Sequence, residues 1–175
     1  MESKAAIHTE YGKNLTVDNV QIPDPRPDQV IVKLHSSGVC HSQLHQMHNP
    51  DSPTPSLLGH EGTGTVIAKG SDVTHLEEGD LAIVTWVNRE PVKGRPVFPP
   101  TGVTYNEAPL NGATYTWGEH VLVRSGYVVK IPKSSDKYNS SIVGCAVLTG
   151  AGAVLHTAKV RPEESVAIFG VGGVG

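Results

Sequence analysis

Two cysteines, a histidine and a glutamate in this sequence have the side-chain types that bind a transition-metal ion. Cys40 lies in a segment rich in glycine and hydroxyl residues, His60 and Glu61 are adjacent between two glycines, and Cys145 is the second of two cysteines. A catalytic zinc ion takes three protein ligands and keeps one exchangeable position. Taken singly, each residue is more often a buried structural side chain. Taken together, they predict an open zinc site.

The segments around these residues are predicted to be short strands. Gly 19 and Pro 13 in 175 residues favour strands and turns over a helical bundle. Apolar runs or alternation predict strands at 5–7, 15–17, 30–36, 62–68, 81–86, 119–123 and 127–131. A short helix is predicted at Ser42–Met47, ended by Asn49-Pro50. Short strands at this spacing indicate a barrel or a sandwich, and they make the protein mainly β with some α.

Two longer segments depart from this strand pattern. Residues 87–118 are irregular and rich in proline, glycine and asparagine, so we expect an excursion with a functional role. Residues 140–160 are rich in small apolar residues and lack proline, which predicts one or two helices. The pattern of apolar residues therefore changes from one typical of strands to one typical of helices after the predicted barrel.

The last segment has the pattern of a nucleotide-binding turn. Ser165–Phe169 is a continuous apolar run, typical of a strand buried in a parallel sheet. Gly170, Gly172 and Gly175 follow it with G-x-G-x-x-G spacing, which lets the backbone approach a pyrophosphate at a helix N-terminus. The helix, the second strand and the acidic residue expected about 20 positions later lie beyond this sequence. The segment therefore predicts the first edge of a dinucleotide-binding domain.

Charge and composition argue against several kinds of partner. The formal net charge is −3 and the pI is about 6.3, so a basic surface for nucleic acid or anionic membrane is not expected. We see no apolar run typical of a signal peptide after the N-terminus, and no stretch approaching the roughly 20 apolar residues of a spanning helix. Two distant cysteines without a secretion signal predict free thiols or metal ligands in a reducing compartment, the cytoplasm.

Five motifs occur in the order and with the separations of a known family. They are GVCHSQLH, GHEGTG, a Gly-Asp pair before the strand predicted at 81–86, GCAVLTGAG and SVAIFGVGGVG. In these motifs the chain resembles the zinc-dependent medium-chain alcohol dehydrogenase family. The resemblance implies a GroES-like, barrel-type catalytic domain at residues 1–144, a connecting helical segment at 145–163, and the first strand of a truncated NAD(P)-binding Rossmann domain at 164–175.

The resemblance also implies which residues form the metal site. Cys40, His60 and Cys145 match the three ligands of the catalytic zinc. Glu61 matches a carboxylate that can approach the metal when the fourth ligand exchanges. Bound zinc acts as a Lewis acid that lowers the pKa of an alcohol, so that a hydride can pass to the nicotinamide.

Five further residues match family positions for proton transfer, cofactor and substrate. Ser42 matches the hydroxyl that receives the alcohol proton, and His45 the outer base of that relay. His41 matches a basic residue near the pyrophosphate, Thr149 a contact on the nicotinamide side, and Trp86 a wall of the substrate pocket. Two alternatives stay open: the serine could instead cap the short helix, and the tryptophan could belong to the core.

The sequence departs from the family pattern at two places. Many relatives have an aspartate after the relay hydroxyl, where it orients the zinc-bound histidine, and this chain has Gln43. An amide can accept the same hydrogen bond but lacks the charge. Many relatives also have four cysteines for a structural zinc between the positions of Trp86 and Gly118, where this chain has none. We therefore expect one catalytic zinc and no structural zinc.

These observations predict an NAD(P)-dependent zinc alcohol dehydrogenase that interconverts small-molecule alcohols and aldehydes. The cofactors implied are zinc and NAD or NADP, and the full-length enzyme is expected to be a homo-oligomer. The isolated 175 residues are expected to be inactive because the Rossmann domain is incomplete. Two alternatives are a zinc-free relative of the quinone reductases and a GroES-like binding module without chemistry of its own.

Overall fold

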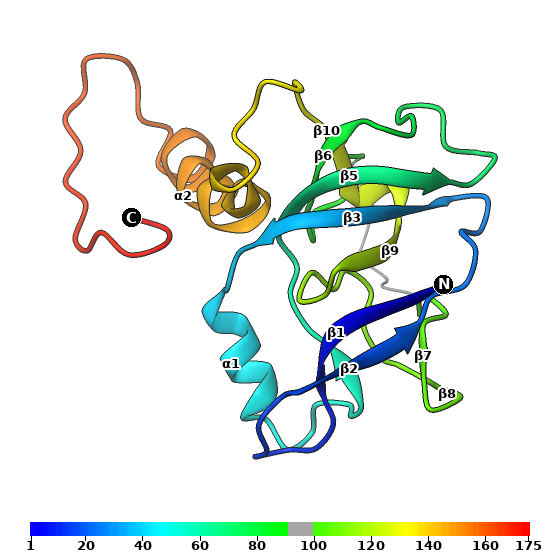
Figure 1. The fold of residues 1–175 in the computed structure, drawn as a ribbon. Coiled ribbons are helices and arrows are strands. Elements are labelled where there is room, and N and C mark those ends of the chain that lie inside the picture. The colour runs from blue at the N-terminus through cyan, green and yellow to red at the C-terminus, as the bar shows by residue number, and fades with distance from the viewer. Residues whose placement is uncertain (91–99) are drawn as a thin grey trace.

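The protein is built around two five-stranded antiparallel sheets. The computed structural model describes residues 1–90 and 100–175 (Figure 1). The first sheet has the order β4-β1-β2-β7-β8, with β1 at Glu2–His8, β2 at Thr16–Gln21, β4 at Ser56–Leu57, β7 at Thr104–Tyr105 and β8 at Ala108–Pro109. The second has the order β10-β6-β5-β3-β9, with β3 at Gln29–Ser37, β5 at Gly62–Lys69, β6 at Leu81–Val84, β9 at His120–Arg124 and β10 at Val128–Lys130. This architecture confirms the mainly β prediction.

The two sheets share one hydrophobic core. Ile7 of β1 and Val20 of β2 belong to the same buried cluster as Val66 of β5 and Leu122 of β9. At the centre of the second sheet, β3 pairs with β5 and β9, so Val32 is opposite residues of both strands. Burial of these branched side chains is the main favourable contribution to the fold. This packed core holds in place the loops that connect the strands at the ends of the sheets.

Two connections place chemistry-bearing residues at one end of the second sheet. Strand β3 leads through Cys40 into α1, His41–Met47, close to the predicted helix at 42–47. The turn before β5 contains Gly59, whose φ of +92° is a conformation that favours glycine. A side chain at Gly59 would lie 2.5 Å from the Thr116 hydroxyl oxygen. This turn therefore needs a glycine immediately before His60.

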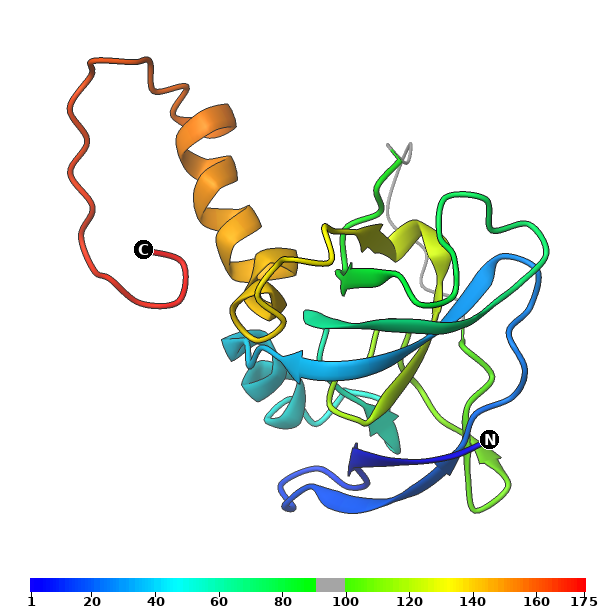
Figure 2. The same ribbon diagram turned by 45° about the horizontal axis from the view of Figure 1, so that its top comes forward.

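One continuous helical segment, Asn139–Thr157, follows the second sheet. It consists of 3₁₀ turns at Asn139–Ile142, wide π turns at Val143–Val147, α2 at Leu148–Gly152 and further π turns at Ala153–Thr157. The first part packs against β6, where Thr85 donates a hydrogen bond to the Gly144 carbonyl at 2.6 Å. The second part projects away from the sheets (Figure 2) and leaves Leu155 61% exposed.

This segment corrects one expectation from the sequence. Its 19 residues are long and apolar enough to cross a membrane by length and composition, whereas we expected no such stretch. We did not expect it because glycine, serine and threonine are interspersed among the apolar residues, so the sequence shows no continuous apolar run. Core helices of soluble proteins can be equally long and apolar, so this property alone does not define a membrane protein.

The predicted strand Ser165–Phe169 is not formed. Residues 158–175 contain neither helix nor strand and run alongside the helical segment as an extended loop (Figure 1). Phe169 is 97% exposed. The physical reason is that a strand is stabilised by a paired neighbour, and no described strand lies beside this segment. Within the predicted excursion 87–118, residues 91–99 lie outside the described part of the chain, and the remainder includes β7 and β8.

Candidate metal centre

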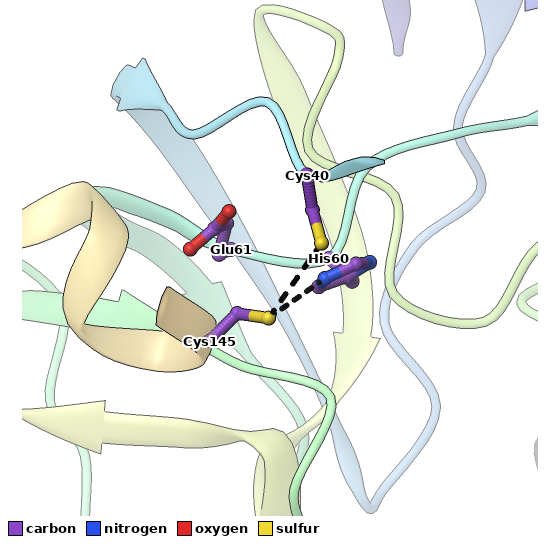
Figure 3. Close-up of side chains that lie close together, drawn as sticks. All are labelled: Cys40, His60, Glu61 and Cys145. Atoms are coloured by element: carbon purple, nitrogen blue, oxygen red, sulfur yellow. Dashed lines mark hydrogen bonds between the residues drawn. The ribbon is translucent and has the colours of Figure 1, made fainter. Parts of the chain in front are cut away.

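Four metal-ligating side chains from three separate segments meet at the end of β3 and β5. The ligand atoms of Cys40, His60, Glu61 and Cys145 all lie within 4.8 Å of one another. Figure 3 shows the two sulfur atoms and the imidazole ring converging, with the carboxylate beside them. The Nε2 atom of His60 lies 3.1 Å from the Cys145 sulfur, which lies 4.0 Å from the Cys40 sulfur. The predicted metal residues are therefore brought together by the fold.

These separations fit a zinc ion. Zinc binds thiolate sulfur at about 2.3 Å and imidazole nitrogen at about 2.0–2.1 Å in tetrahedral geometry. Two ligands of one such ion then lie about 3.8 Å apart for sulfur and sulfur, and about 3.6 Å apart for nitrogen and sulfur. The sulfur–sulfur distance of 4.0 Å is within about 0.2 Å of this value, and the nitrogen–sulfur distance of 3.1 Å is about 0.5 Å shorter, so small side-chain rotations would complete the geometry. Two sulfurs and one nitrogen form the ligand set of a catalytic zinc with one open position.

Glu61 is held next to the three candidate ligands by its burial and by one backbone hydrogen bond. Its side chain is buried, with 2% of its surface exposed, and one carboxylate oxygen accepts a 3.3 Å hydrogen bond from the Ala146 amide. Burial raises the pKa of the Glu61 carboxyl, and the amide of Ala146 opposes the rise. A nearby cation favours the ionised carboxylate. This side chain is therefore suited to a position beside a metal ion.

Gly38 makes room for that carboxylate, and our sequence analysis did not identify its role. A Cβ atom at Gly38 would lie 2.5 Å from the Glu61 side chain. The Gly38 carbonyl also accepts a 3.2 Å hydrogen bond from the indole of Trp117, another residue that we did not identify. The signal in the sequence was the glycine two positions before Cys40. The reason for a glycine at this position becomes clear only from the structure, in which the Glu61 side chain packs against Gly38.

Gln43 is the partner of His60 on the side away from the sulfurs. This glutamine on α1 is 2% exposed, and its amide nitrogen lies 2.6 Å from His60 Nδ1, while its buried amide oxygen has no hydrogen-bond partner in the described part of the chain. Because Nε2 faces Cys145, Nδ1 is the ring atom left to carry the proton. Turning the Gln43 amide over brings its unpartnered oxygen to Nδ1, where it can accept this proton in a hydrogen bond. Burial lowers the pKa of His60, which favours the neutral ring that a metal requires. Gln43 is therefore placed to orient the His60 ring as its outer partner.

Replacing Gln43 with leucine is expected to weaken zinc binding by about 10- to 100-fold, the usual cost of losing an outer partner of a metal-bound histidine. The aspartate variant, which restores a charged acceptor, is expected to bind zinc at least as tightly as the wild-type chain. Competition with a chromophoric chelator measures both affinities. An unchanged affinity in Gln43→Leu would show that the amide does not orient His60.

The thiol of Cys145 resists ionisation while no metal is bound. Burial, followed by the nearby Cys40 and Glu61 side chains, raises its pKa from about 9 to about 11. A metal ligand must be a thiolate. Zinc binding is therefore expected to release a proton from this thiol and to weaken as the pH falls.

The metal-free chain is expected to lose stability as the pH rises from about 9 to about 11. The unfolded thiol ionises first because its pKa is lower, so the folded state holds more protons in this window and the free energy of unfolding falls. Urea unfolding under reducing conditions measures this slope. Buried Tyr115, whose pKa is also raised, contributes to it. The matched comparison is Cys145→Ser, which must show a shallower slope than the wild-type chain.

Three further predicted residues lie on α1, next to this centre. His41, Ser42 and His45 are exposed on α1. His41 lines a cavity of about 410 Å³ together with Cys40 and Cys145. No hydrogen bond joins Ser42 to His45 in the described part of the chain, and the helix is not capped by a side chain, so the capping alternative for Ser42 is not borne out.

Trp86 lies beside His60 and is not part of the hydrophobic core. Its ring is 6.5 Å from that of His60, at 73°, and the side chain is 42% exposed. It lines a second cavity of about 260 Å³ with Gln43, Gln46 and Thr114. The position is compatible with the wall of a substrate pocket.

The residues predicted to contact the cofactor are not assembled into a site. Thr149 is exposed on α2. Gly170, Gly172 and Gly175 lie in the exposed loop at 158–175, where Gly170 has φ +96°. Residues 158–175 contain neither helix nor strand, so these glycines are not part of a strand-turn-helix unit of the kind that binds a pyrophosphate.

Residues 26–133, more than half of the chain, match the family described as "Alcohol dehydrogenase GroES-like domain". The chain therefore belongs to this domain family, within the zinc-dependent medium-chain alcohol dehydrogenases. Among solved structures, benzyl alcohol dehydrogenase from Acinetobacter calcoaceticus superposes with a TM-score of 0.84 at 27% identity, over all of this chain and 53% of that one. An alcohol dehydrogenase zinc-binding domain protein from Burkholderia ambifaria gives 0.82 at 26% identity, over 92% of this chain and 50% of that one.

Curated relatives of similar sequence are S-(hydroxymethyl)glutathione dehydrogenases. The protein from Escherichia coli (strain SMS-3-5 / SECEC) is 31% identical and that from Synechocystis sp. (strain ATCC 27184 / PCC 6803 / Kazusa) is 32% identical, each over all of this chain and 54% of the relative. The chain thus spans about half the length of the curated relatives it matches. A quinone oxidoreductase from Coxiella burnetii, 20% identical with a TM-score of 0.70, shares the fold.

Proposed function

We propose that this chain is the catalytic-domain portion of a zinc-dependent alcohol dehydrogenase that uses NAD or NADP. The observation that carries the proposal is the convergence of Cys40, His60 and Cys145 within a domain of the alcohol dehydrogenase family. The same three residues argue against a zinc-free quinone reductase, because such an enzyme has no use for this ligand set. One zinc per chain is proposed, since the two cysteines of the sequence are both in this cluster.

The residues of the chain would hold and activate an alcohol in distinct ways. A zinc ion held by the cluster would supply the Lewis acid that favours loss of the alcohol proton. Ser42, two residues after Cys40, is proposed to take that proton, and His45, one helical turn further, to pass it to solvent. Glu61 is proposed to approach the metal site while the ligand in its open position changes. Trp86 is proposed to position the carbon skeleton of the substrate.

The remaining predicted residues are proposed to act on the cofactor, whose nicotinamide would carry the hydride. His41 would contact the pyrophosphate, and Thr149 the nicotinamide side. Gly170, Gly172 and Gly175 would form the phosphate turn once a following helix completes it. We propose the domain division at residues 144 and 163 on the same basis, with the exposed helical segment connecting the catalytic and cofactor-binding parts.

We propose small-molecule primary alcohols and aldehydes as substrates, with benzyl alcohol and S-(hydroxymethyl)glutathione as the first to test. These two choices come from the relatives' names, which describe those proteins. A homo-oligomer is proposed for the complete protein, without nucleic-acid or membrane partners. The cytoplasm is the proposed compartment because a reducing environment keeps both thiols available for metal.

The proposal is tested with the protein in the length that its gene encodes. Zinc-loaded protein is expected to reduce NAD or NADP when one of these alcohols is added, and removal of zinc by a chelator is expected to abolish the reaction. Cys40→Ala serves as the inactive comparison. Turnover that survives both zinc removal and this variant would overturn the proposal.

A further inference from the structure

We propose that His41 and His45, on the exposed face of α1, form a second binding site for a divalent transition-metal ion. The two histidines are one helical turn apart, so their side chains lie on the same side of α1. Paired histidines at this spacing on a helix are a recurrent zinc-binding arrangement. Both residues are exposed, so an ion can reach them from solvent. The site is separate from the cluster of Cys40, His60 and Cys145.

The rings already have the separation that chelation needs. Their centroids are 5.0 Å apart, with an angle of 68° between the ring planes. Two imidazoles bound to one tetrahedral ion at about 2.0–2.1 Å have ring centres about 5 Å apart. Chelation therefore needs rotation of the two side chains and no movement of the helix backbone. No hydrogen bond in the described part of the chain ties either ring to another partner.

The ligand type selects the metal. Neutral imidazoles suit nickel, copper and zinc, whereas calcium and magnesium prefer oxygen ligands. A pair of imidazoles lacks the two thiolates and the third protein ligand of the cysteine-histidine cluster. The pair is therefore the weaker site, and it fills after the main one as the metal concentration rises.

A metal ion bound to His41 and His45 would lie next to the proposed active site. His41 lines the cavity that also contains Cys40 and Cys145. In the proposed function the same ring contacts the pyrophosphate, and His45 accepts the relay proton. An ion bound to both rings would prevent both roles, so excess transition metal would inhibit. The binding itself does not depend on the proposed function.

The pair is tested apart from the main site in Cys40→Ser/Cys145→Ser protein, whose folding is checked by circular dichroism. Calorimetry is expected to show one nickel ion per chain. Adding His45→Gln is expected to weaken nickel binding by at least about tenfold, because His41 then has no histidine one helical turn away. His156→Gln, at an exposed histidine on the other helical segment with no histidine one turn away, is the matched control and is expected to leave the affinity unchanged.

A second measurement does not depend on the cysteine variants. In zinc-loaded wild-type protein, substoichiometric nickel is expected to broaden the imidazole proton signals of His41 and His45 before those of His156. The proposal is overturned if nickel broadens the three histidines equally, or if His45→Gln binds nickel as tightly as its parent. Failure of the main zinc site would leave the calorimetric result in the cysteine variant unchanged, so the two proposals fail independently.

Discussion

Replacing His60 with alanine is expected to lower the zinc affinity of this chain by more than about 100-fold. Loss of an outer partner of a metal ligand already costs about 10- to 100-fold, and His60 is proposed to be a ligand itself. The variant leaves two thiols 4.0 Å apart and a carboxylate, without the ring nitrogen that lies 3.1 Å from Cys145. Two thiols without the imidazole form an incomplete site.

The matched control for this variant is His75→Ala. The His75 ring contacts the Ser125 carbonyl at 3.2 Å and is not part of the metal cluster. Chelator competition is expected to give the wild-type affinity for this control. Equal affinity in His60→Ala and His75→Ala would mean that the imidazole of His60 is not a ligand.

The polypeptide of residues 1–175 is expected to show no alcohol-dependent reduction of NAD or NADP. Hydride transfer needs the nicotinamide carbon held about 3–3.5 Å from the substrate carbon, and such positioning lowers the barrier by many kcal/mol. In this polypeptide the glycine turn is exposed, within a segment at 158–175 that contains neither helix nor strand. The metal cluster opens on the adjacent 410 Å³ cavity, where water weakens electrostatic effects.

Calorimetry with NAD and NADP, together with absorbance of the reduced cofactor, measures this directly. Saturable binding and turnover are both expected to be absent for a preparation whose mass corresponds to an end at Gly175. The positive control is the protein in its complete encoded length. Turnover by the 175-residue preparation would show that the described residues suffice to position the cofactor.

The strands of the two sheets could be predicted because they carry local signals. The apolar runs at 30–36, 62–68 and 119–123 correspond to β3, β5 and β9, which form neighbouring strands of one sheet. Turn residues indicated the C-terminal end of α1 in a similar way, since Asn49-Pro50 comes directly after the C-cap residue His48. Local patterns do not specify pairing, so the division into two sheets came from the structure.

The prediction of a final strand at Ser165–Phe169 was wrong, because the apolar pattern on which it rested is only local. Its apolar residues satisfy the pattern of a buried parallel strand, but a strand also needs neighbours for its backbone hydrogen bonds. Val166 and Ile168 are instead 51% and 60% exposed. The propensity of this segment is therefore not expressed without partners.

The metal residues were predicted from their types, and their convergence was not. Cys40 and Cys145 are 105 positions apart in the chain, and nothing in their spacing brings them together. The contacts that refine the site depend on the tertiary fold, namely the amide of Gln43 against His60 and the space that Gly38 leaves for Glu61. Sequence analysis could name Gln43 as a departure from relatives, but its burial and its 2.6 Å contact came from the structure.

X-ray absorption at the zinc edge, combined with metal analysis of the purified chain, tests the proposed metal centre most directly. The expected result is one zinc per chain, with two sulfur neighbours at about 2.3 Å and one imidazole nitrogen at about 2.0–2.1 Å. The sulfur signal is expected to disappear in Cys40→Ser/Cys145→Ser. Zinc bound without sulfur neighbours in the wild-type chain, or two zinc ions retained when both cysteines are replaced, would contradict the account.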